Sequence, residues 1–326
     1  MITTRLLSGF EDPTCGPAEW ARLLEAGPTN AIDVTWPIQR AWWETCGEGE
    51  LLLIAAARDG VDVALAPLFA AGGMVFNLSL KDKLDMIGDT SDPMVLDALL
   101  TTARASVPNF QGFRFYFIPD DSPTGKRLQD AAARLELVCH DEGELPSPAL
   151  GIASDPTRAQ ACTRKQSLRR RERWFRDNGE LVVHHFRDGE SVLPQLDGFF
   201  EQHISRRADL PDPSPFLAPT ERAFYGRMTE LAGDTDWLRF TRIDWNDRPI
   251  AFHYGFCYRG RYLYGVPSFA VDLLERWPGE VLLRQLLLAA IDEGAAEFDF
   301  GIGDEDYKYR YATQVTTLRT WGLYPT

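Results

Sequence analysis

The sequence has few cysteines, no long apolar run and no excess of positive charge. Its five cysteines are scattered through 326 residues and never stand at a C-x-x-C spacing, which argues against a disulfide framework or a zinc knuckle. No apolar stretch approaches the roughly 18 residues of a membrane span, and the first residues lack the apolar core of a signal peptide. We therefore expect a cytoplasmic protein with free, mostly buried thiols.

Charge is negative and unevenly divided. The net charge of −14 argues against general binding to nucleic acid. Residues 1–150 contain 11 Lys and Arg against 22 Asp and Glu, whereas residues 151–326 contain 23 against 26. A polyanionic ligand should therefore prefer the second half.

The composition and the order of expected elements indicate two globular domains. In each half, strands alternate with helices and form hairpins, such as the one expected at Asp59-Gly60, which predicts a mixed α/β sheet flanked by helices. The segment 144–148 contains two prolines and reads as a linker. We predict domains at residues 1–150 and 151–326.

The second half is expected to begin with a long helix over residues 156–177. A strand over 180–186 and further helices are followed by a three-strand meander between residues 237 and 267. A helix with apolar residues on one face is expected from Gly279 to Glu293, and a strand over 297–300 follows it.

The stretch 298–309 combines a strand end, glycines, four carboxylates, two tyrosines and Lys308. A lysine among carboxylates stays charged and suits the binding of an anion or a developing oxyanion. The alternative is a solvated acidic turn.

The first predicted helix of the second half carries seven cations between Arg164 and Arg176, opposed there only by Glu172. Pairs within one helix cannot neutralise so many charges. Either carboxylates elsewhere neutralise them, with the acidic first half as a source, or the helix binds an anionic ligand.

The second half resembles the GNAT acyltransferase superfamily, and more closely the CelD-like (cellulose-biosynthesis-like) branch related to the FemAB aminoacyltransferases. The resemblance rests on an ordered set of segments: 165–173, His203 with Arg206-Arg207, 250–256, Pro278-Gly279, and Phe298-Asp299-Phe300 through Tyr307-Lys308. The first half fits the same branch through Trp42-Trp43, Ala66-Pro67-Leu68 and 118–123. The resemblance implies two tandem GNAT-like domains, each with a mixed, mostly antiparallel sheet flanked by helices.

The resemblance also implies where an acyl-CoA donor would bind. A helix amino terminus offers unpaired N–H groups and partial positive charge to a diphosphate. The implied donor-binding residues are Tyr264, Gly265, Val266, Pro267, Gly279, Glu280, Val281 and Arg284. The usual Arg/Gln-x-x-Gly-x-Gly/Ala loop is absent and Glu280 lies in the first turn, so an ordinary capped core helix is the alternative.

Candidate catalytic and acceptor-binding residues follow from residue type and from the resemblance. A histidine or carboxylate can act as a base and a tyrosine as an acid. The catalytic candidates are Lys308, Glu305, Asp304, Asp299, His203 and Tyr307. The candidates for binding the acceptor are Asp85, His253, Arg206, Arg207 and Arg169, each with a purely structural role as its alternative.

These observations predict an N-acyltransferase that moves an acetyl or other acyl group from acyl-CoA to an amine, without a metal. The acceptor would be a small molecule, an amino sugar or an amino-acid-like group. One alternative is a FemAB-like aminoacyltransferase that uses a charged tRNA and contacts its acceptor end. Another is a catalytically silent GNAT-like module that binds an anionic ligand.

Overall fold

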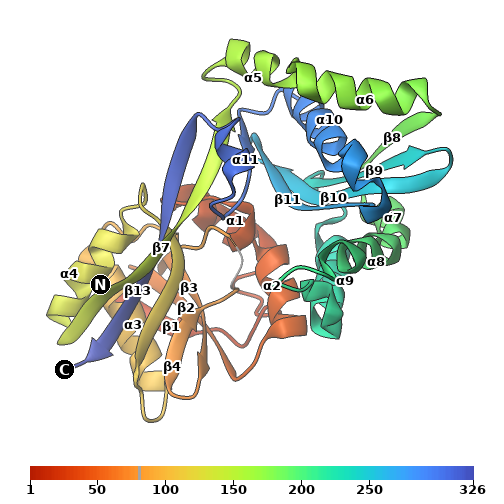
Figure 1. Cartoon of the computed structure of the whole chain (residues 1–326). Coiled ribbons are helices and arrows are strands. Elements are labelled where there is room, and N and C mark those ends of the chain that lie inside the picture. Colours follow the sequence, from red (N-terminus) through yellow and green to blue (C-terminus); the bar gives the residue numbers. More distant parts are fainter. Residues whose placement is uncertain (80–81) are drawn as a thin grey trace. The chain divides into compact units, whose positions relative to one another are not determined.

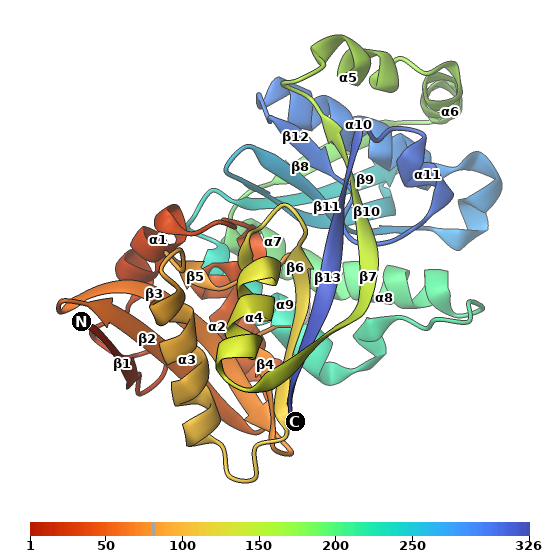
Figure 2. The same cartoon turned by 90° about the vertical axis from the view of Figure 1, so that its left-hand side faces the viewer.

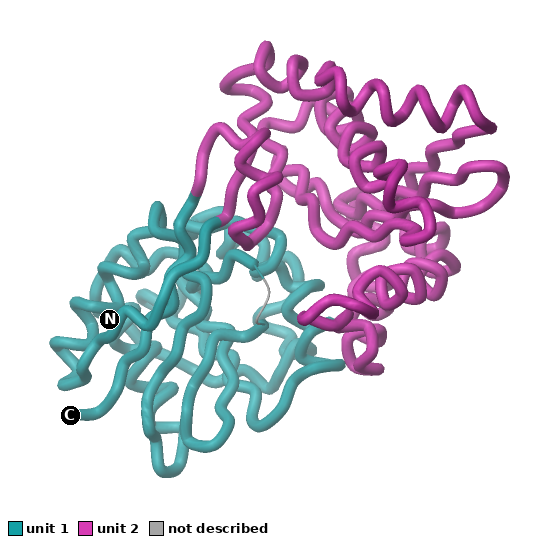
Figure 3. The backbone as a smooth tube through the Cα atoms, in the orientation of Figure 1, with its two compact units in different colours: residues 1–146, 316–326 teal, residues 147–315 magenta. Residues whose placement is uncertain are grey.

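The computed structural model of the chain describes residues 1–79 and 82–326, and these form two compact units (Figure 3). The first unit contains residues 1–146 and 316–326, and the second contains residues 147–315. The predicted α/β class with mixed sheets is confirmed. The segment 316–326, which the sequence reading gave to the second domain, lies in the first unit.

The first unit is built on a mixed sheet (Figures 1 and 2). In spatial order its strands are β1 (Ile2–Leu6), β2 (Glu50–Arg58), β3 (Val61–Ala71), β4 (Met74–Asn77), β6 (Gly112–Pro119) and β13 (Gln314–Pro325), with the short β5 (Ile87–Gly88) beside β3. The predicted hairpin is present, because Asp59 and Gly60 adopt the positive φ angles of 51° and 84° that its tight turn requires.

Helices cover this sheet and complete its core. They are α1 (Pro17–Ala26), α2 (Trp36–Cys46), α3 (Pro93–Ser106) and α4 (Thr124–Arg134), with the short η1 (Ile32–Val34) before α2. The buried faces of α3 and α4 join β2, β3 and β6 in one apolar cluster. Figure 2 shows these two helices on the same face of the sheet.

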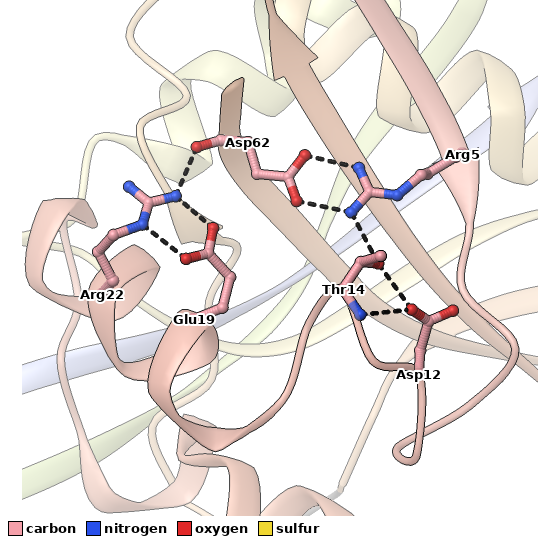
Figure 4. Close-up of polar contacts among 6 residues, drawn as sticks. All are labelled: Arg5, Asp12, Thr14, Glu19, Arg22 and Asp62. Carbon is pink, nitrogen blue, oxygen red and sulfur yellow. Dashed lines mark hydrogen bonds and ion pairs between the residues drawn. The ribbon is translucent and has the colours of Figure 1, made fainter. Parts of the chain in front are cut away.

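A network of ion pairs ties β1, β3 and α1 together (Figure 4). The guanidinium of Arg5 makes two 2.6 Å contacts with the carboxylate of Asp62. Arg22 donates to Glu19 at 2.8 Å and to the backbone oxygen of Asp62 at 2.7 Å. In this network the protein itself supplies the partner of each charge.

The two units divide between Pro146 and Ser147, inside the predicted linker at 144–148. This segment is not an irregular loop, however, because strand β7 runs without interruption from Leu137 to Gly151. A proline is tolerated in a strand where no partner needs its N–H. The carbonyl of Pro148 still accepts a hydrogen bond from Phe300 at 3.0 Å. The chain therefore passes from the first unit to the second along a strand.

The sheet of the second unit begins with the end of β7. It continues with β12 (Glu297–Asp299), β11 (Arg261–Phe269), β10 (Arg248–Tyr258), β9 (Leu238–Trp245) and β8 (Leu181–Phe186). The predicted meander corresponds to the antiparallel β9, β10 and β11, and β11 pairs in parallel with β12.

The helices of the second unit are α5 (Pro156–Thr163), α6 (Gln166–Asp177), α7 (Gly189–Val192), α8 (Leu196–Arg207), α9 (Pro219–Ala232), α10 (Pro278–Asp292) and α11 (Asp306–Tyr309). Short 3-10 turns stand at η2 (Leu193–Gln195), η3 (Pro215–Leu217) and η4 (Val271–Arg276). Helix α10 buries its leucines in the main apolar cluster of this unit.

The helix predicted over 156–177 is interrupted and forms α5 and α6. Lys165 has a ψ of 129°, outside the helical range. Its ammonium group donates to the backbone oxygen of Arg310 at 2.8 Å and lies 3.8 Å from the ring of Tyr311. These contacts hold Lys165 in an extended conformation, which a sequence pattern does not reveal.

Candidate active site

Two strands of the second unit diverge and leave an opening. Strand β11 pairs with β12 only where Arg261 to Leu263 face Glu297 to Asp299. Beyond this point β11 continues to Phe269. The segment that follows β12 turns away through Gly301 and Gly303, which have φ angles of 70° and 133°. The second half of β11, from Val266 to Phe269, pairs with β10 along one of its edges.

A cavity of about 310 Å³ lies in the second unit beside this diverging strand. It is bounded by the end of α8, by β11, by the start of α10 and by the segment around α11. Its lining residues are Arg206, Tyr264, Pro267, Phe269, Leu274, Trp277, Gly279, Glu280, Leu283, Tyr307, Arg310 and Tyr311. The structure thus brings together five of the predicted donor- or acceptor-binding residues (Tyr264, Pro267, Gly279, Glu280 and Arg206) and the predicted catalytic Tyr307.

The polar lining contains three phenols, two guanidinium groups and one carboxylate, and among the predicted site residues burial shifts the pKa of Tyr264, Tyr307 and Arg206. Burial raises the pKa of Tyr264 and of Tyr307, so both hydroxyl groups stay protonated and can donate hydrogen bonds. Arg206 donates to the backbone oxygen of Pro267 at 2.7 Å and stacks 4.4 Å from the ring centre of Phe269. Among the described residues no carboxylate pairs with Arg206, and burial lowers its pKa.

The amino terminus of α10 borders the same cavity. A Cβ atom on Gly279 would come within 2.7 Å of the Phe269 ring, so the close packing of this ring requires glycine. Glu280 forms an ion pair with Arg171 of α6, and its charge is therefore balanced. Trp277 caps the helix in a left-handed conformation, with φ 61° and ψ 51°.

Val281 and Arg284 face elsewhere on α10. Val281 is fully buried in the apolar core. Arg284 donates to the backbone oxygen of Thr163 at 3.0 Å and pairs with Glu172. Both residues hold α10 against its neighbours and do not line the cavity.

Gly265 and Val266 lie on β11 between the lining residues Tyr264 and Pro267. Gly265 stands opposite the register shift of β10 between Tyr254 and Phe256. A Cβ atom there would come within 2.6 Å of the Tyr254 carbonyl oxygen, so this irregular pairing favours glycine.

Lys308 is buried and its charge has partners within the protein. Only 3% of its side chain is exposed. Its ammonium group contacts the backbone oxygens of Gly301 and Ile302 at 3.2 and 2.7 Å, and the carboxylate of Glu305 at 2.9 Å. The three contacts match the three N–H donors of a lysine, so Lys308 holds the glycine loop after β12 in place.

The carboxylates around Lys308 have different surroundings. Asp299 is buried and accepts from the N–H of Gly301 at 2.9 Å, which fixes the end of β12. Asp304 is exposed and accepts from the hydroxyl group of Tyr309 at 2.5 Å. Glu305 is 58% exposed and close enough to raise the pKa of Tyr307 by its charge, after the larger effect of burial.

His203 and Arg207 lie on α8 with Arg206 but outside the cavity lining. The ring of His203 is buried against Phe216, and its Nδ1 atom lies 2.8 Å from the hydroxyl oxygen of Ser214. Burial, and to a smaller degree the charges of Arg206 and Arg207, lower the pKa of His203 to about 4. Arg207 pairs with Asp212 in the following loop.

His253 is fully buried in β10, where it stacks 5.5 Å from the ring centre of Tyr264. Burial lowers its pKa to about 3, so the ring is neutral. It therefore supports Tyr264 from behind and does not line the cavity.

Asp85 belongs to the first unit and is buried there. Its carboxyl group accepts hydrogen bonds from Thr29 at 2.5 Å, Ser122 at 2.6 Å and the N–H of Met86 at 2.7 Å. Burial raises its pKa. These contacts give Asp85 a structural role within its own unit.

Arg169 lies on the exposed side of α6 with Arg170 and Arg173. In the part of the chain that the structure describes, none of the three has an ion-pair partner. The other cations of this helix are balanced by nearby groups of the same unit, such as Glu172 and Glu280.

Six lining residues were not anticipated: Phe269, Leu274, Trp277, Leu283, Arg310 and Tyr311. The one local signal was Trp277 directly before Pro278-Gly279, because a large exposed aromatic at a helix start often borders a binding site. The others are ordinary apolar or charged positions until the fold brings them together.

The five cysteines are free thiols, and no three His, Cys, Asp or Glu side chains gather as a metal site would require among residues 1–79 and 82–326. Within the same ranges, every helix is too short or too polar to cross a membrane.

Comparison with known proteins agrees with this architecture. Residues 163–309 match the family model of the acetyltransferase (GNAT) domain. No curated protein sequence matches the chain. Among solved structures, FemX is similar with a TM-score of 0.66 at 12% identity, over 95% of this chain and 96% of FemX.

Two further structures cover most of the chain. L-PGS from Bacillus licheniformis has a TM-score of 0.58 at 14% identity, over 95% of this chain and 91% of its own. A tandem GNAT protein from the clavulanic acid biosynthesis pathway has a TM-score of 0.54 at 13% identity, over 99% and 98%. At these identities the likeness shows the fold alone.

The fold is therefore that of tandem GNAT-like proteins, as the sequence predicted. Residues 163–309 match the GNAT acetyltransferase domain, and the fold of the whole chain is similar to that of FemX.

Proposed function

We propose that this protein is an N-acyltransferase that moves an acyl group from acyl-CoA to an amine on a small acceptor, such as an amino sugar or an amino-acid-like group, in the cytoplasm. The cavity between β11, the start of α10 and α11 carries this proposal. All of its lining residues except Arg310 and Tyr311 lie within the matched GNAT domain. The cavity combines an apolar slot with protonated phenols and with Arg206, which has no acidic partner among the described residues.

The donor would lie along the second half of β11 with its diphosphate toward α10. The amino terminus of a helix favours negative charge through its unpaired N–H groups. Arg310 is exposed at the rim and adds a positive charge. Glu280 would oppose a phosphate if it were free, but Arg171 balances it. These features support a site for an acyl-CoA co-substrate.

The phenols support the bond changes. In a direct transfer, the amine nitrogen attacks the thioester carbon and the carbon–sulfur bond breaks. We assign Tyr307 as the donor of a hydrogen bond, and then a proton, to the departing thiolate, because its phenol stays protonated beside the cavity. Tyr264 and the N–H groups of β11 would stabilise charge on the carbonyl oxygen.

The attacking amine must lose a proton, and Glu305 is the base that we propose. Its carboxylate is exposed and lies close to Tyr307. Glu305 pairs with Lys308 but its side chain is 58% exposed, whereas the side chain of the lining carboxylate Glu280, which pairs with Arg171, is 24% exposed. His203 is buried against Ser214 away from the lining. Asp304 remains the second candidate base.

Thermal unfolding with acetyl-CoA, longer acyl-CoAs and free CoA tests the donor. A ligand present at about 100 times its dissociation constant stabilises the fold by about 2.7 kcal/mol, which a thermal scan detects readily. We expect stabilisation by at least one acyl-CoA, and less in an Arg310→Glu variant than in the matched exposed variant Arg158→Glu. If none of these compounds raises the unfolding temperature, acyl-CoA is not the donor.

A FemAB-like aminoacyl transfer from tRNA is the second candidate. The exposed arginines of α6 favour it, because they could contact an RNA acceptor end. Binding of tRNA that weakens steeply with salt, without any effect of acyl-CoA, would favour this function. Stable binding of an anion without transfer to any amine would indicate the silent module.

A further inference from the structure

One region of the second unit exposes apolar side chains in an unusually short stretch. The turn η4 and the residue after it expose Val271, Leu274 and Trp277 by 42%, 56% and 51%. Isolated exposed apolar residues are common, but a cluster on one turn marks a contact surface.

The neighbouring helix α6 supplies positive charge beside this turn. Arg169, Arg170 and Arg173 are exposed and, among the described residues, have no ion-pair partner. Arg173 is four residues from Arg169 and three from Arg170, so its side chain neighbours both on the exposed side of the helix.

Two cation–π contacts join the apolar turn and the basic helix into one surface. The guanidinium of Arg171 lies 4.2 Å from the ring centre of Trp277, and that of Arg276 lies 4.3 Å from the ring centre of Trp174. Each contact links a residue of α6 with one at the end of η4.

Among the described residues, arginines outnumber unpaired carboxylates on this surface of α6 and η4. Asp272 is paired with Arg248 through contacts of 2.6 and 2.7 Å. Glu275 and Asp177 are exposed and oppose the arginines in part. Four exposed arginines, including Arg276, remain against these two carboxylates, although the whole chain has a net charge of −14.

We propose that α6 and the η4 turn form a docking surface for an anionic lipid bilayer. Tryptophan favours the headgroup level, aliphatic side chains enter the acyl boundary, and arginines attract anionic headgroups. An RNA partner would use the arginines and aromatic rings, but it would leave Val271 and Leu274 without a role. The combination therefore favours lipid over RNA.

This surface adjoins the cavity, because Leu274 and Trp277 belong to both. Docking would bring the cavity mouth close to the lipid headgroups. An amphiphilic acceptor or donor could then reach the site from the membrane. The docking itself does not depend on the acyl transfer proposed above.

Flotation of the full chain with lipid vesicles tests the proposal. We expect binding to vesicles of phosphatidylcholine with about one third phosphatidylglycerol, weak binding to pure phosphatidylcholine, and weaker binding at higher salt. Each arginine near an anionic surface contributes about fivefold in affinity, so the triple variant R169Q/R170Q/R173Q should bind about 100-fold more weakly.

The matched charge control is the triple variant R58Q/K126Q/R134Q of the first unit, which removes the same number of positive charges. It should bind the anionic vesicles as the unmodified protein does. The apolar variant Leu274→Ser should reduce vesicle binding, whereas Val61→Ser, at a site that is 62% exposed in the first unit, should not. Circular dichroism confirms that each variant is folded.

Three results would overturn the proposal: no binding to anionic vesicles, equal binding to neutral ones, or an equal loss in both triple variants. If tRNA binds through the same arginines while Leu274→Ser has no effect and vesicles do not bind, the surface recognises RNA instead. None of these outcomes depends on acyl-CoA, so the docking and the transferase proposals fail separately.

Discussion

Charged groups in the first unit and around the cavity of the second unit are treated in different ways. In the first unit, the carboxylate of Asp62 meets both nitrogen atoms of the Arg5 fork, and Glu19 meets Arg22 (Figure 4). In the cavity, Arg206 has a carbonyl and an aromatic ring beside it but, among the described residues, no carboxylate.

The difference separates structural charges from charges that await a ligand. A buried charge without a partner is costly, so it persists where something outside the chain completes it. By this criterion Lys308 belongs with the structural group, because its ammonium has three protein acceptors. Arg206 belongs with the second group.

The largest expected effect is on stability, from Lys308→Met. This change leaves the carbonyls of Gly301 and Ile302 without their donor, and we expect unfolding in urea to show a loss of about 3 kcal/mol. The exposed Lys126→Met is the control and should lose less than about 0.5 kcal/mol. A stable Lys308→Met protein with strongly reduced transfer would instead make Lys308 a catalytic group.

The next effect is on catalysis, from Tyr307→Phe. Loss of a positioned proton donor typically costs about 100-fold in kcat, and the fold should be unaffected because the change removes a single hydroxyl group from a residue that lines the cavity. Steady-state kinetics with the acyl-CoA that binds best is the measurement. Tyr309 lies outside the lining, so the variant Tyr309→Phe should have the kcat of the unmodified protein. If Tyr307→Phe and Tyr309→Phe have equal kcat values, Tyr307 is not the proton donor.

His203 should make stability depend on pH. Its folded-state pKa of about 4 lies below the unfolded value near 6.5, so the unfolded state binds more protons between them. The stability is complete above pH 6.5 and is lost as the pH falls toward 4. Over this range the free energy of unfolding of His203→Asn, measured in urea, should fall by roughly 2 kcal/mol less than that of the unmodified protein. An equal fall in both proteins would contradict the prediction.

The smallest effects are expected from two substitutions that compare Arg206 of the cavity directly with Arg5 of the first unit. Arg206→Gln should weaken binding of the donor about tenfold and leave stability nearly unchanged, because it removes a charge without an acidic partner. Arg5→Gln should do the reverse, with a loss of about 1 kcal/mol of stability and unchanged affinity. Calorimetric titration measures the affinity for the donor, and urea unfolding measures the stability of both variants. If the two variants change affinity and stability alike, Arg206 and Arg5 do not differ in role.

Elements set by local signals were predicted well. The hairpin at Asp59-Gly60 needs positive φ angles, and the helix that begins at Pro278-Gly279 has a recognisable start and an apolar face. The strands β1 and β13 were missed, and residues 144–148 in the second part of β7 were interpreted as a linker because of their prolines. Their partners lie far along the chain, so no local pattern specifies them.

The same limit applied to the site. Residue types drew attention to Lys308 and His203, but neither side chain lines the cavity. What decides the difference is whether a protein group already meets each polar atom, as Gly301 and Ile302 do for Lys308. Tyr264, Tyr307 and Arg206 come from three segments far apart in sequence, and only the fold shows that they share one space.

The two ends of the second unit are fastened to each other. The N–H of Thr313 donates to the carbonyl of Ala149 at 2.8 Å, and the N–H of Gly151 donates to the hydroxyl oxygen of Thr313 at 2.9 Å. The second unit is thus an insertion within the first, whose final strand is made after it. During synthesis, the first unit must wait for residues 316–326 before its sheet is complete, whereas the inserted unit can close as soon as its own last residues emerge.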